Sequence, residues 1–581
     1  MLAKINKITS WQAALVIAVV GFAVYFTGLA TPFQGDDTLQ IVNNIPVHSI
    51  THLKVLFEGG TFYNGHGLAP LAGSYYRPLM MVMFSLLYTL FGPHSIYFHL
   101  FQLMLYIGSA IILHLFFRYS FKPALALALA LVFLVHPINS QDVFSIAGTQ
   151  EVLFFFFGIL ALYLLIRFQS IKSLLLVALC LFLSLLSKES GILFVAMAAI
   201  YLFWFDRRKR LYTFVGTMVL PAALYLILKM HAVGLLGANP HNAPIDSLNL
   251  THRLMTAPSI VLFYLTKFIF PWKLATAYHW VYPTFSVSHV LIPLIVDLAV
   301  VALVVYTAFL IHRKATKAQL YSFVFFAIWA ALGLLLTLQI IPLDVTATER
   351  YFIYPMIGLL GMAGIVLTVF PPRIRPRWIL LVIAALVIGV LGVRTALRGL
   401  DYRNQYTLAY KDISASPQDY NAYKLLAADL DSQGNYSVAA TYAQRSVSIF
   451  PTPENYYNLG LALEGQGDLG RAFQAFSTGL HYGNYYPLCD SLAPLIVAYS
   501  GNQASGLQFF SSSLKLFPQD STLWMYLAIF EATHSNNAEA KIAISQAARY
   551  GQVNQTVYDD LMTNKPFVLN IPDVGKSIRI P

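Results

Sequence analysis

The sequence predicts an all-α protein in which a polytopic membrane domain precedes an α-solenoid of helical repeats. Of the 581 residues, 57% are hydrophobic and only 11% are charged, whereas soluble domains carry charge at about a quarter of their positions. The long apolar runs all precede Arg398, and repeats of about 34 residues follow it. We therefore predict a membrane domain at 1–400, a repeat domain at 401–555 and a C-terminal tail at 556–581.

Apolar runs long enough to cross a hydrocarbon core of about 30 Å predict about eleven spans. They begin near Trp11, Ser95, Ala124, Glu151, Lys172, Gly191, Leu211, His289, Leu320, Tyr351 and Trp378. Two further runs, Pro78 to Phe91 and Ile260 to Phe270, are short and are followed by Gly-Pro or Pro-Trp. We predict that both form re-entrant or interfacial helices rather than spans.

The net charge of +11 is concentrated in short loops such as 206–210, 312–317 and 373–377. This distribution indicates the positive-inside rule rather than a groove for nucleic acid. Lys4 and Lys7 precede the first span without a small-residue cleavage site, which predicts an uncleaved anchor with its N-terminus inside. An odd number of spans then places the loops 35–76, 137–150, 187–190, 235–257 and 342–350 outside, together with the repeats.

The region after residue 400 matches the tetratricopeptide pattern of paired helices with glycine at the turn. The first unit carries Tyr423, Leu426, Ala427, Gly434, Tyr436, Ala439 and Pro451, and the second carries Tyr456, Leu459, Gly460, Gly467 and Ala472. A later unit contains Trp524 and Ala528, and a degenerate segment lies between, so we predict four units. Their stack would form a concave surface for a peptide or protein, and pure scaffolding or dimerisation is the alternative.

Two adjacent carboxylates, Asp36 and Asp37, come directly after the first span. Such a pair can supply a general base, since a neighbouring charge and partial desolvation raise the pKa of one member. Capping of a helix that begins at Thr38 is the more common role of Asp in this position.

Basic residues lie in three of the predicted outer loops. Arg77 follows Tyr76, Lys188 precedes Glu189, and Glu349 and Arg350 precede Tyr351. Arginine binds phosphate through two hydrogen bonds, and ionisable residues at membrane depth are functional candidates. Snorkelling to lipid headgroups and structural ion pairing are the alternatives.

A further outer loop contains His136 and Asp142 and leads to Glu151. An imidazole and acids together suggest a metal, but no cysteine and no second nearby histidine accompanies them, so we predict no metal site. Cys180 and Cys489 lie in different domains and do not predict a disulfide. Neither a phosphate-cradling glycine loop nor a nucleophile elbow is present in the sequence, so any energy must arrive with the substrate.

Seven motifs, taken in order, resemble those of the GT-C glycosyltransferases, and most closely the transmembrane and tetratricopeptide-repeat-containing O-mannosyltransferases. They are GDDTLQIVNN (35–44), SYYRPL (74–79), IYFHLFQLML (96–105), HPINSQDVFSIAGTQEVL (136–153), SKESGI (187–192), FPWKL (270–274) and TERYFIYPMIGL (348–359). Asp142 and Glu151 depart from the pattern of the animal members.

The resemblance implies the roles of the site residues. One member of the acidic pair would be the catalytic carboxylate, with Asp37 slightly favoured over Asp36. Arg77, Lys188 and Arg350 would contact the phosphate of a polyprenyl-phosphate sugar, the co-substrate. Supporting roles would fall to Glu189, His136, Asp142, Glu349, Tyr76 and Tyr351.

The implied function is transfer of a sugar, mannose in the resembling family, to an acceptor hydroxyl on the outer face. The acceptor would be a protein Ser or Thr that the repeats present, and a glycan or lipid is an alternative. No tightly bound cofactor is implied, and a need for a divalent metal is undetermined. The short tail and the lack of a eukaryotic presequence suggest a bacterial inner membrane with undecaprenyl phosphate as carrier.

Two readings without transferase activity compete with this one. A transporter or flippase of lipid-linked sugars would need polar residues at mid-membrane and matching halves, which the sequence lacks. An envelope assembly factor would use the repeats and keep the membrane part as an anchor.

Overall fold

The computed structural model describes residues 8–63, 75–234, 243–374, 376, 378–571 and 575–580. Lys4, Lys7 and Ser74, parts of the loops 35–76 and 235–257, and Arg375 and Arg377 of the basic cluster lie outside the described residues. The chain forms two compact units, a membrane unit that ends at Gln418 and a repeat unit that begins at Asp419. This division falls beyond the predicted boundary at residue 400, because one more helix packs with the membrane unit.

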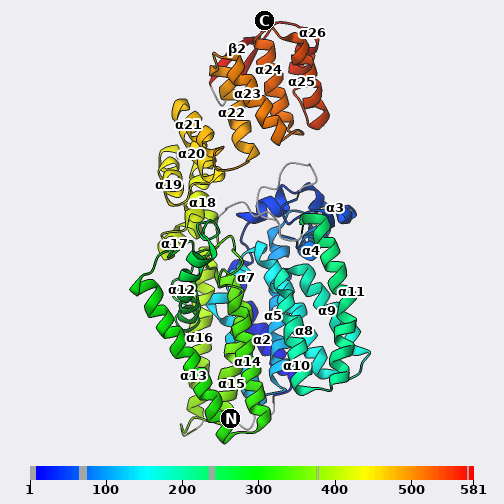
Figure 1. The fold of residues 1–581 in the computed structure, drawn as a ribbon, viewed down its shortest axis with the longest axis vertical. Coiled ribbons are helices and arrows are strands. Elements are labelled where there is room, and N and C mark those ends of the chain that lie inside the picture. Colours follow the sequence, from blue (N-terminus) through cyan, green and yellow to red (C-terminus); the bar gives the residue numbers. More distant parts are fainter. Residues whose placement is uncertain are drawn as a thin grey trace. The chain divides into compact units, whose positions relative to one another are not determined.

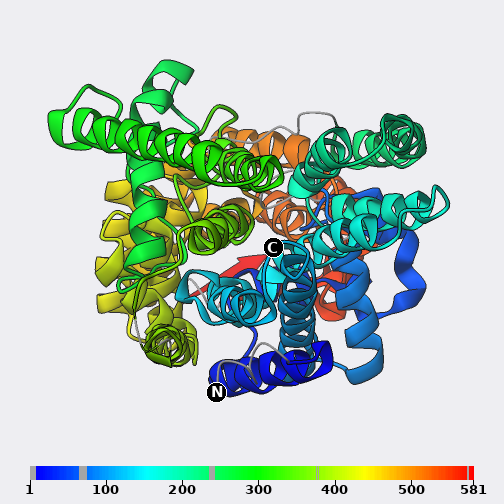
Figure 2. The same ribbon diagram turned by 90° about the horizontal axis from the view of Figure 1, so that it is seen from below.

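The membrane unit consists of helices that run side by side in Figure 1 and are seen from below in Figure 2. Its longer helices are α2 (Ser10–Tyr25), α4 (Pro78–Phe91), α5 (Ser95–Phe117), α6 (Pro123–Val135), α8 (Thr149–Arg167), α9 (Ser173–Ser187), α10 (Ile192–Phe205), α11 (Arg208–Val233), α12 (Leu250–Ile269), α13 (Ile292–Lys314), α14 (Lys317–Leu335), α15 (Ile353–Val369), α16 (Trp378–Asp401) and α17 (Gln405–Ala415). Short helices lie between them: η1 (Phe26–Gly28), η2 (Thr38–Val42), η3 (Ile45–His48), η4 (Ile50–His52), α3 (Leu53–Glu58), η5 (Pro137–Asn139), α7 (Gln141–Phe144), η6 (Ile146–Gly148), η7 (Glu189–Gly191), η8 (Val287–Leu291) and η9 (Glu349–Phe352).

Fewer helices are long enough to span than the sequence predicted. In the described part of the chain, 8 helices are long and apolar enough to cross a membrane, or up to 9 if the pair 123–135 and 137–144, bent by 48°, is one span. Helices form at all eleven predicted positions, but α9 has only 15 residues and α10 only 14. A helix of this length rises little more than about 20 Å, which is short of the hydrocarbon core.

The second short run belongs to a longer helix than predicted. Ile260 to Phe270 was expected to stand alone, whereas α12 extends over 20 residues from Leu250. Its start is fixed by Asn249, whose side chain accepts a hydrogen bond from the His252 backbone N–H at 3.0 Å. The helix continues through Pro258, so the apolar run marks only its second half.

The core of the membrane unit is rich in aromatic side chains. Trp329 of α14 is fully buried and its ring lies 5.9 Å from those of Phe116 and Phe194, which come from α5 and α10. Close contact between α14 and α15 requires Gly358, because a Cβ there would lie 2.4 Å from the backbone nitrogen of Ala330. This packing gives the loops at the helix ends a rigid support.

In the described part of the repeat unit, eight helices form four packed pairs. They are α18 (Tyr420–Ser432) with α19 (Tyr436–Ile449), α20 (Pro453–Gly465) with α21 (Leu469–Gly479), α22 (Tyr486–Tyr499) with α23 (Gln503–Leu516), and α24 (Ser521–Thr533) with α25 (Asn537–Tyr550). Gly434 and Gly467 take the left-handed conformation at the first two turns, with φ of 76° and 79°. The fourth turn uses Ser535 instead.

The segment predicted as a tail is folded. It forms α26 (Gln555–Thr563) and an antiparallel hairpin of β1 (Phe567–Ile571) and β2 (Lys576–Ile580). Val557, Leu561 and Ile580 join the hydrophobic core of the repeat unit. Within the described ranges the fold is therefore all-α except for one hairpin, whose alternation of apolar and polar residues in β2 is typical of a strand with one buried face.

Candidate functional site

The acidic pair lies in a tight turn between η1 and η2. Gly35 adopts a φ of +56°, a conformation that favours glycine, and directs the chain into the helix at Thr38. Asp37 is 2% exposed. Its Oδ1 accepts a hydrogen bond from the Ala147 backbone N–H at 2.8 Å and its Oδ2 accepts one from the Gln34 N–H at 3.2 Å. The buried carboxylate thus joins the first loop to η6.

Capping does not explain Asp37. It occupies the N-cap position of η2 but makes no side-chain hydrogen bond to that helix. Burial raises the pKa of the Asp37 carboxyl to about 7. The hydrogen bonds from the two backbone N–H groups lower this pKa in part, and the charge of Asp36 adds a smaller increase.

Asp36 has a different environment from its neighbour. Its side chain is exposed. It also interacts electrostatically with the guanidinium of Arg350, which lies more than 300 positions later in the sequence. The two aspartates therefore divide into a buried carboxylate that binds backbone and an accessible one beside a cation.

Arg77 lies at the start of α4, directly after the predicted first outer loop, 35–76. Its Nε is 3.7 Å from Oε2 of Glu189, and its guanidinium stacks on the Tyr75 ring at 4.3 Å from the ring centroid. Glu189 also accepts a hydrogen bond from the Tyr76 backbone N–H at 3.3 Å, while the Tyr76 ring is fully buried. Glu189 therefore orients both residues.

Lys188 lies between α9 and η7 and is almost fully buried. Its ammonium pairs with Oε1 of Glu151 and lies 4.6 Å from the centroid of the Tyr351 ring. The turn is compact because Gly191 packs against the end of α9, where a Cβ would lie 2.7 Å from the Ser184 carbonyl carbon. Lys188 is also within electrostatic range of Arg77 and Arg350.

Arg350 completes a cluster of three cations that come from three separate segments. Asp344, Glu151 and Asp36 stabilise its charge. Asp344 lies in the predicted outer loop 342–350 but was not predicted as a site residue, since one acid in a loop carries no distinctive spacing. We call Asp36, Arg77, Glu151, Lys188, Glu189, Asp344, Arg350 and Tyr351 the polar cluster.

Two predicted supporting residues hold backbone instead of facing the polar cluster. Oε1 of Glu349 accepts hydrogen bonds from the Ala275 N–H at 2.8 Å and from the Tyr278 hydroxyl at 2.9 Å. His136 contacts the Phe268 carbonyl through Nε2 at 2.9 Å and accepts the Ile138 N–H at Nδ1. Glu349 thus fixes the segment that follows α12, and His136 contacts the last turn of α12.

Asp142 lies at the buried side of the polar cluster. It is fully buried and interacts electrostatically with Glu151, Lys188 and Arg350. Several buried polar atoms here have no hydrogen-bond partner among the described residues: both carboxylate oxygens of Asp142, Oε1 of Gln150, Oε2 of Glu151 and Nε of Arg77 and Arg350. Buried polar atoms without a partner are rare in native proteins, and a catalytic role or a bound water or ion is among the reasons for them.

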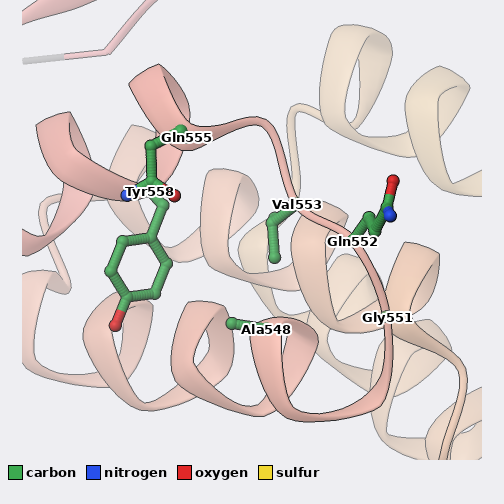
Figure 3. A pocket seen from close by; sticks show the side chains of 6 residues that line it. All are labelled: Ala548, Gly551, Gln552, Val553, Gln555 and Tyr558. Atoms are coloured by element: carbon green, nitrogen blue, oxygen red, sulfur yellow. The ribbon is translucent and has the colours of Figure 1, made fainter.

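The described residues contain no group of three or more His, Cys, Asp or Glu side chains that could hold a metal ion. A cavity of about 350 Å³ lies elsewhere, in the repeat unit. Figure 3 shows its lining on α25, on α26 and on the loop between them: Ala548, Gly551, Gln552, Val553, Gln555 and Tyr558. None of these side chains is charged, so the polar cluster is the better candidate for chemistry.

The sequence also missed a set of buried contacts from α17. Asp412 is 2% exposed, pairs with Nη2 of Arg398 at 2.9 Å and accepts a hydrogen bond from the Thr276 N–H at 3.1 Å. Gln405 accepts a hydrogen bond from the Gly35 N–H at 3.1 Å. No local spacing signals these contacts, because Thr276 and Gly35 lie more than a hundred residues from their partners in the chain and Arg398 lies in another helix, 14 residues before Asp412.

Known proteins match this chain over parts of its length. The family described as dolichyl-phosphate-mannose-protein mannosyltransferase matches residues 76–232, which include Arg77, Glu151 and Lys188. Protein O-mannosyl-transferase TMTC2 of Homo sapiens is 27% identical over 285 residues, which cover 45% of this chain and 33% of that protein.

Two relatives from Mus musculus match over shorter stretches. TMTC3 is 29% identical over 150 residues, covering 26% of this chain and 16% of the relative. TMTC1 is 33% identical over 144 residues, which cover 24% of this chain and 15% of the relative. The chain thus spans no more than a third of the length of these relatives. These matches confirm that the chain resembles the GT-C glycosyltransferases, and within them the protein O-mannosyltransferases with transmembrane and tetratricopeptide-repeat segments.

Proposed function

We propose that this protein is a membrane glycosyltransferase that moves mannose from a polyprenyl-phosphate donor to a Ser or Thr hydroxyl of a protein. One observation carries the proposal: an accessible carboxylate and three cations from four separate segments meet in one polar cluster. Attack at an anomeric carbon with phosphate as leaving group needs these two kinds of group.

The donor phosphate is assigned to Arg77 and Arg350, with Lys188 beside them. Nε of both arginines is buried without a hydrogen-bond partner among the described residues, and the contact from Arg77 to Glu189 is long at 3.7 Å. Lys188 has three N–H donors, so its pairing with Glu151 leaves two for phosphate oxygens. Their charges stabilise the negative charge that grows on the departing phosphate.

Asp36 is assigned as the general base because it is the exposed member of the acidic pair. The acceptor oxygen forms a bond to the anomeric carbon while the bond from that carbon to the phosphate oxygen breaks. The hydroxyl proton moves to the Asp36 carboxylate, and the electron pair of the broken bond leaves with the polyprenyl phosphate. A single displacement of this kind inverts the anomeric centre.

Asp37 is assigned a positioning role. Its hydrogen bond from the Gln34 N–H closes the turn that carries Asp36, and its bond from the Ala147 N–H holds this turn against η6, which is close to Asp142 in the chain. A carboxyl with a pKa of about 7 also suits proton transfer, so exchanging the two roles is the specific alternative.

We also propose that the reaction takes place on the outer face of a bacterial inner membrane, with undecaprenyl phosphate as carrier. The basic loops 206–210 and 312–317 support this orientation by the positive-inside rule. The repeat unit would bind the acceptor protein, as helical-repeat solenoids bind peptides on a concave surface.

The test is transfer by the purified full-length protein in liposomes that contain undecaprenyl-phosphate mannose. Acceptor peptides rich in Ser and Thr are analysed by intact mass, and liposomes with undecaprenyl-phosphate glucose are the control for the sugar. The expected result is a hexose added to the peptide only with the mannose donor. Sugar movement across the bilayer without transfer to peptide would instead support the flippase.

A further inference from the structure

We propose that α17, the last helix before the repeat unit, is a positioning element of the catalytic site, an inference that rests on the function proposed above. Its residues hold both the turn that carries the base and the segment that carries Arg350. By sequence this helix belongs to the repeat domain, yet its buried contacts are with the membrane unit.

The first contact reaches the acidic pair. Gln405 begins α17, and its Oε1 accepts a hydrogen bond from the backbone N–H of Gly35, the residue before Asp36, at 3.1 Å. Nearby, the carbonyl of Tyr402 accepts a hydrogen bond from Nε2 of Gln34 at 3.0 Å. Gly35 has a φ of +56°, a conformation that favours glycine, and the Gln405 side chain binds its amide there. These two bonds hold the turn in addition to the bond from Ala147.

The second contact reaches the phosphate side. Oδ2 of Asp412 accepts hydrogen bonds from the N–H of Thr276 at 3.1 Å and from its hydroxyl at 2.5 Å. The Thr276 carbonyl in turn lies 2.8 Å from the hydroxyl of Thr348, two residues before Arg350.

The pair of Asp412 with Arg398 fixes the helix itself. Arg398 is 1% exposed at the end of α16 and binds Asp412 at 2.9 Å and Asp401 at 3.0 Å. A buried pair of this kind is strongly destabilised when one partner is removed, which makes α17 a firm support. Because α18 begins at Tyr420, only a short segment joins this support to the repeats.

The experiment uses the full-length protein with Gln405→Ala, which removes the hydrogen-bond acceptor for Gly35. We expect backbone hydrogen exchange in residues 33–38 to rise about tenfold. We also expect kcat for mannose transfer to fall about tenfold while the KM for undecaprenyl-phosphate mannose changes less than about twofold, since the base is misplaced and the phosphate ligands are not.

Two further variants separate positioning from general loss of structure. Gln405→Glu keeps an oxygen acceptor at the same place and should restore both exchange and kcat. Gln418→Ala makes the same substitution at an exposed residue after α17 and should leave both unchanged. Thr276→Val, which removes the hydroxyl that binds Asp412, should instead raise the donor KM more than it lowers kcat.

The outcomes distinguish this inference from the proposed function. Unchanged exchange at 33–38 together with unchanged kcat in Gln405→Ala overturns the role of α17. A wild-type protein that transfers no mannose overturns the proposed function. In that case hydrogen exchange in residues 33–38 still tests whether α17 holds the turn, because it should rise in Gln405→Ala and return to the wild-type rate in Gln405→Glu.

Discussion

Aspartates in the two units have different partners. In the repeat unit Asp419, Asp468 and Asp520 accept hydrogen bonds from backbone N–H groups two or three residues further along and so cap α18, α21 and α24. In the membrane unit Asp37 accepts from Ala147, and Asp412 accepts from Thr276. Each of the three acids in the repeats stabilises one helix end, whereas Asp37 and Asp412 join segments that are distant in the sequence.

This difference predicts that substitutions in the two units act on different properties. A lost cap should cost local stability and leave the chemistry intact. A lost long-range contact or an altered accessible carboxylate should change catalysis or the stability of the whole unit. The four variants that follow test this division.

The largest expected effect is that of Asp36→Asn. Replacing the proposed base should reduce mannose transfer by a factor of about 10² to 10⁴. Since the side chain is exposed, the thermal midpoint in detergent should change by no more than about 1 °C. Asp37→Asn is the matched control and should lose less than about tenfold. The reverse ranking of the two variants would make Asp37 the base.

Asp37 should make the stability of the membrane unit depend on pH. Its pKa is raised to about 7 in the folded protein from an ordinary value near 3.8. Between these values the folded state binds more protons than the unfolded state, so stability is greatest at low pH and falls as pH rises toward 7. The loss of unfolding free energy that Asp37 causes over this pH range is at most about 4 kcal/mol.

Thermal midpoints in detergent at several pH values measure this effect. The slope between pH 4 and pH 7 should become flatter in Asp37→Asn, because asparagine does not titrate in this range. An equally steep slope in the variant would assign the pH dependence to other groups.

Arg77→Ala should weaken binding of undecaprenyl-phosphate mannose by about tenfold to a hundredfold, the value of a charge-assisted hydrogen bond. Arg77→Lys should restore only part of the affinity, because lysine lacks the planar fork that binds phosphate. Arg313→Ala, at an exposed position in a predicted cytoplasmic loop, is the control. Equal donor affinity in Arg77→Ala and Arg313→Ala would remove Arg77 from the phosphate site.

The smallest effect is expected in the repeat unit. Asp468→Ala removes the cap that accepts the Arg471 N–H at 3.1 Å and should destabilise the start of α21 by about 1 kcal/mol. Hydrogen exchange of residues 469–472 should rise about fivefold, and mannose transfer to a short peptide should stay the same. Asp468→Asn keeps the cap and is the control. A loss of transfer in Asp468→Ala alone would contradict the division between the units.

The sequence predicted the elements with strong local signals. The eleven apolar positions all form helices, and Gly434 and Gly467 take the left-handed conformation expected at repeat turns. Arg77, Lys188 and Arg350 were singled out because ionisable residues beside apolar runs are rare. Their roles as phosphate ligands stay predictions.

Other features were missed because their signals are weak or distant. The start of α12 lies in a polar stretch before the apolar run, and the hairpin of β1 and β2 is too short for its alternation to stand out. The capping role considered for the acidic pair is local, whereas Asp37 actually binds Ala147, which only folding brings near.

The sequence by itself determined that this is a helical membrane protein with repeats and which motifs carry charge, because hydrophobicity and helix periodicity are properties of neighbouring residues. Only the tertiary structure decided which acid is buried, which cations meet and that α17 belongs with the membrane unit. Each of these depends on contacts between residues more than a hundred positions apart, whose geometry is set by helix packing and not by local pattern.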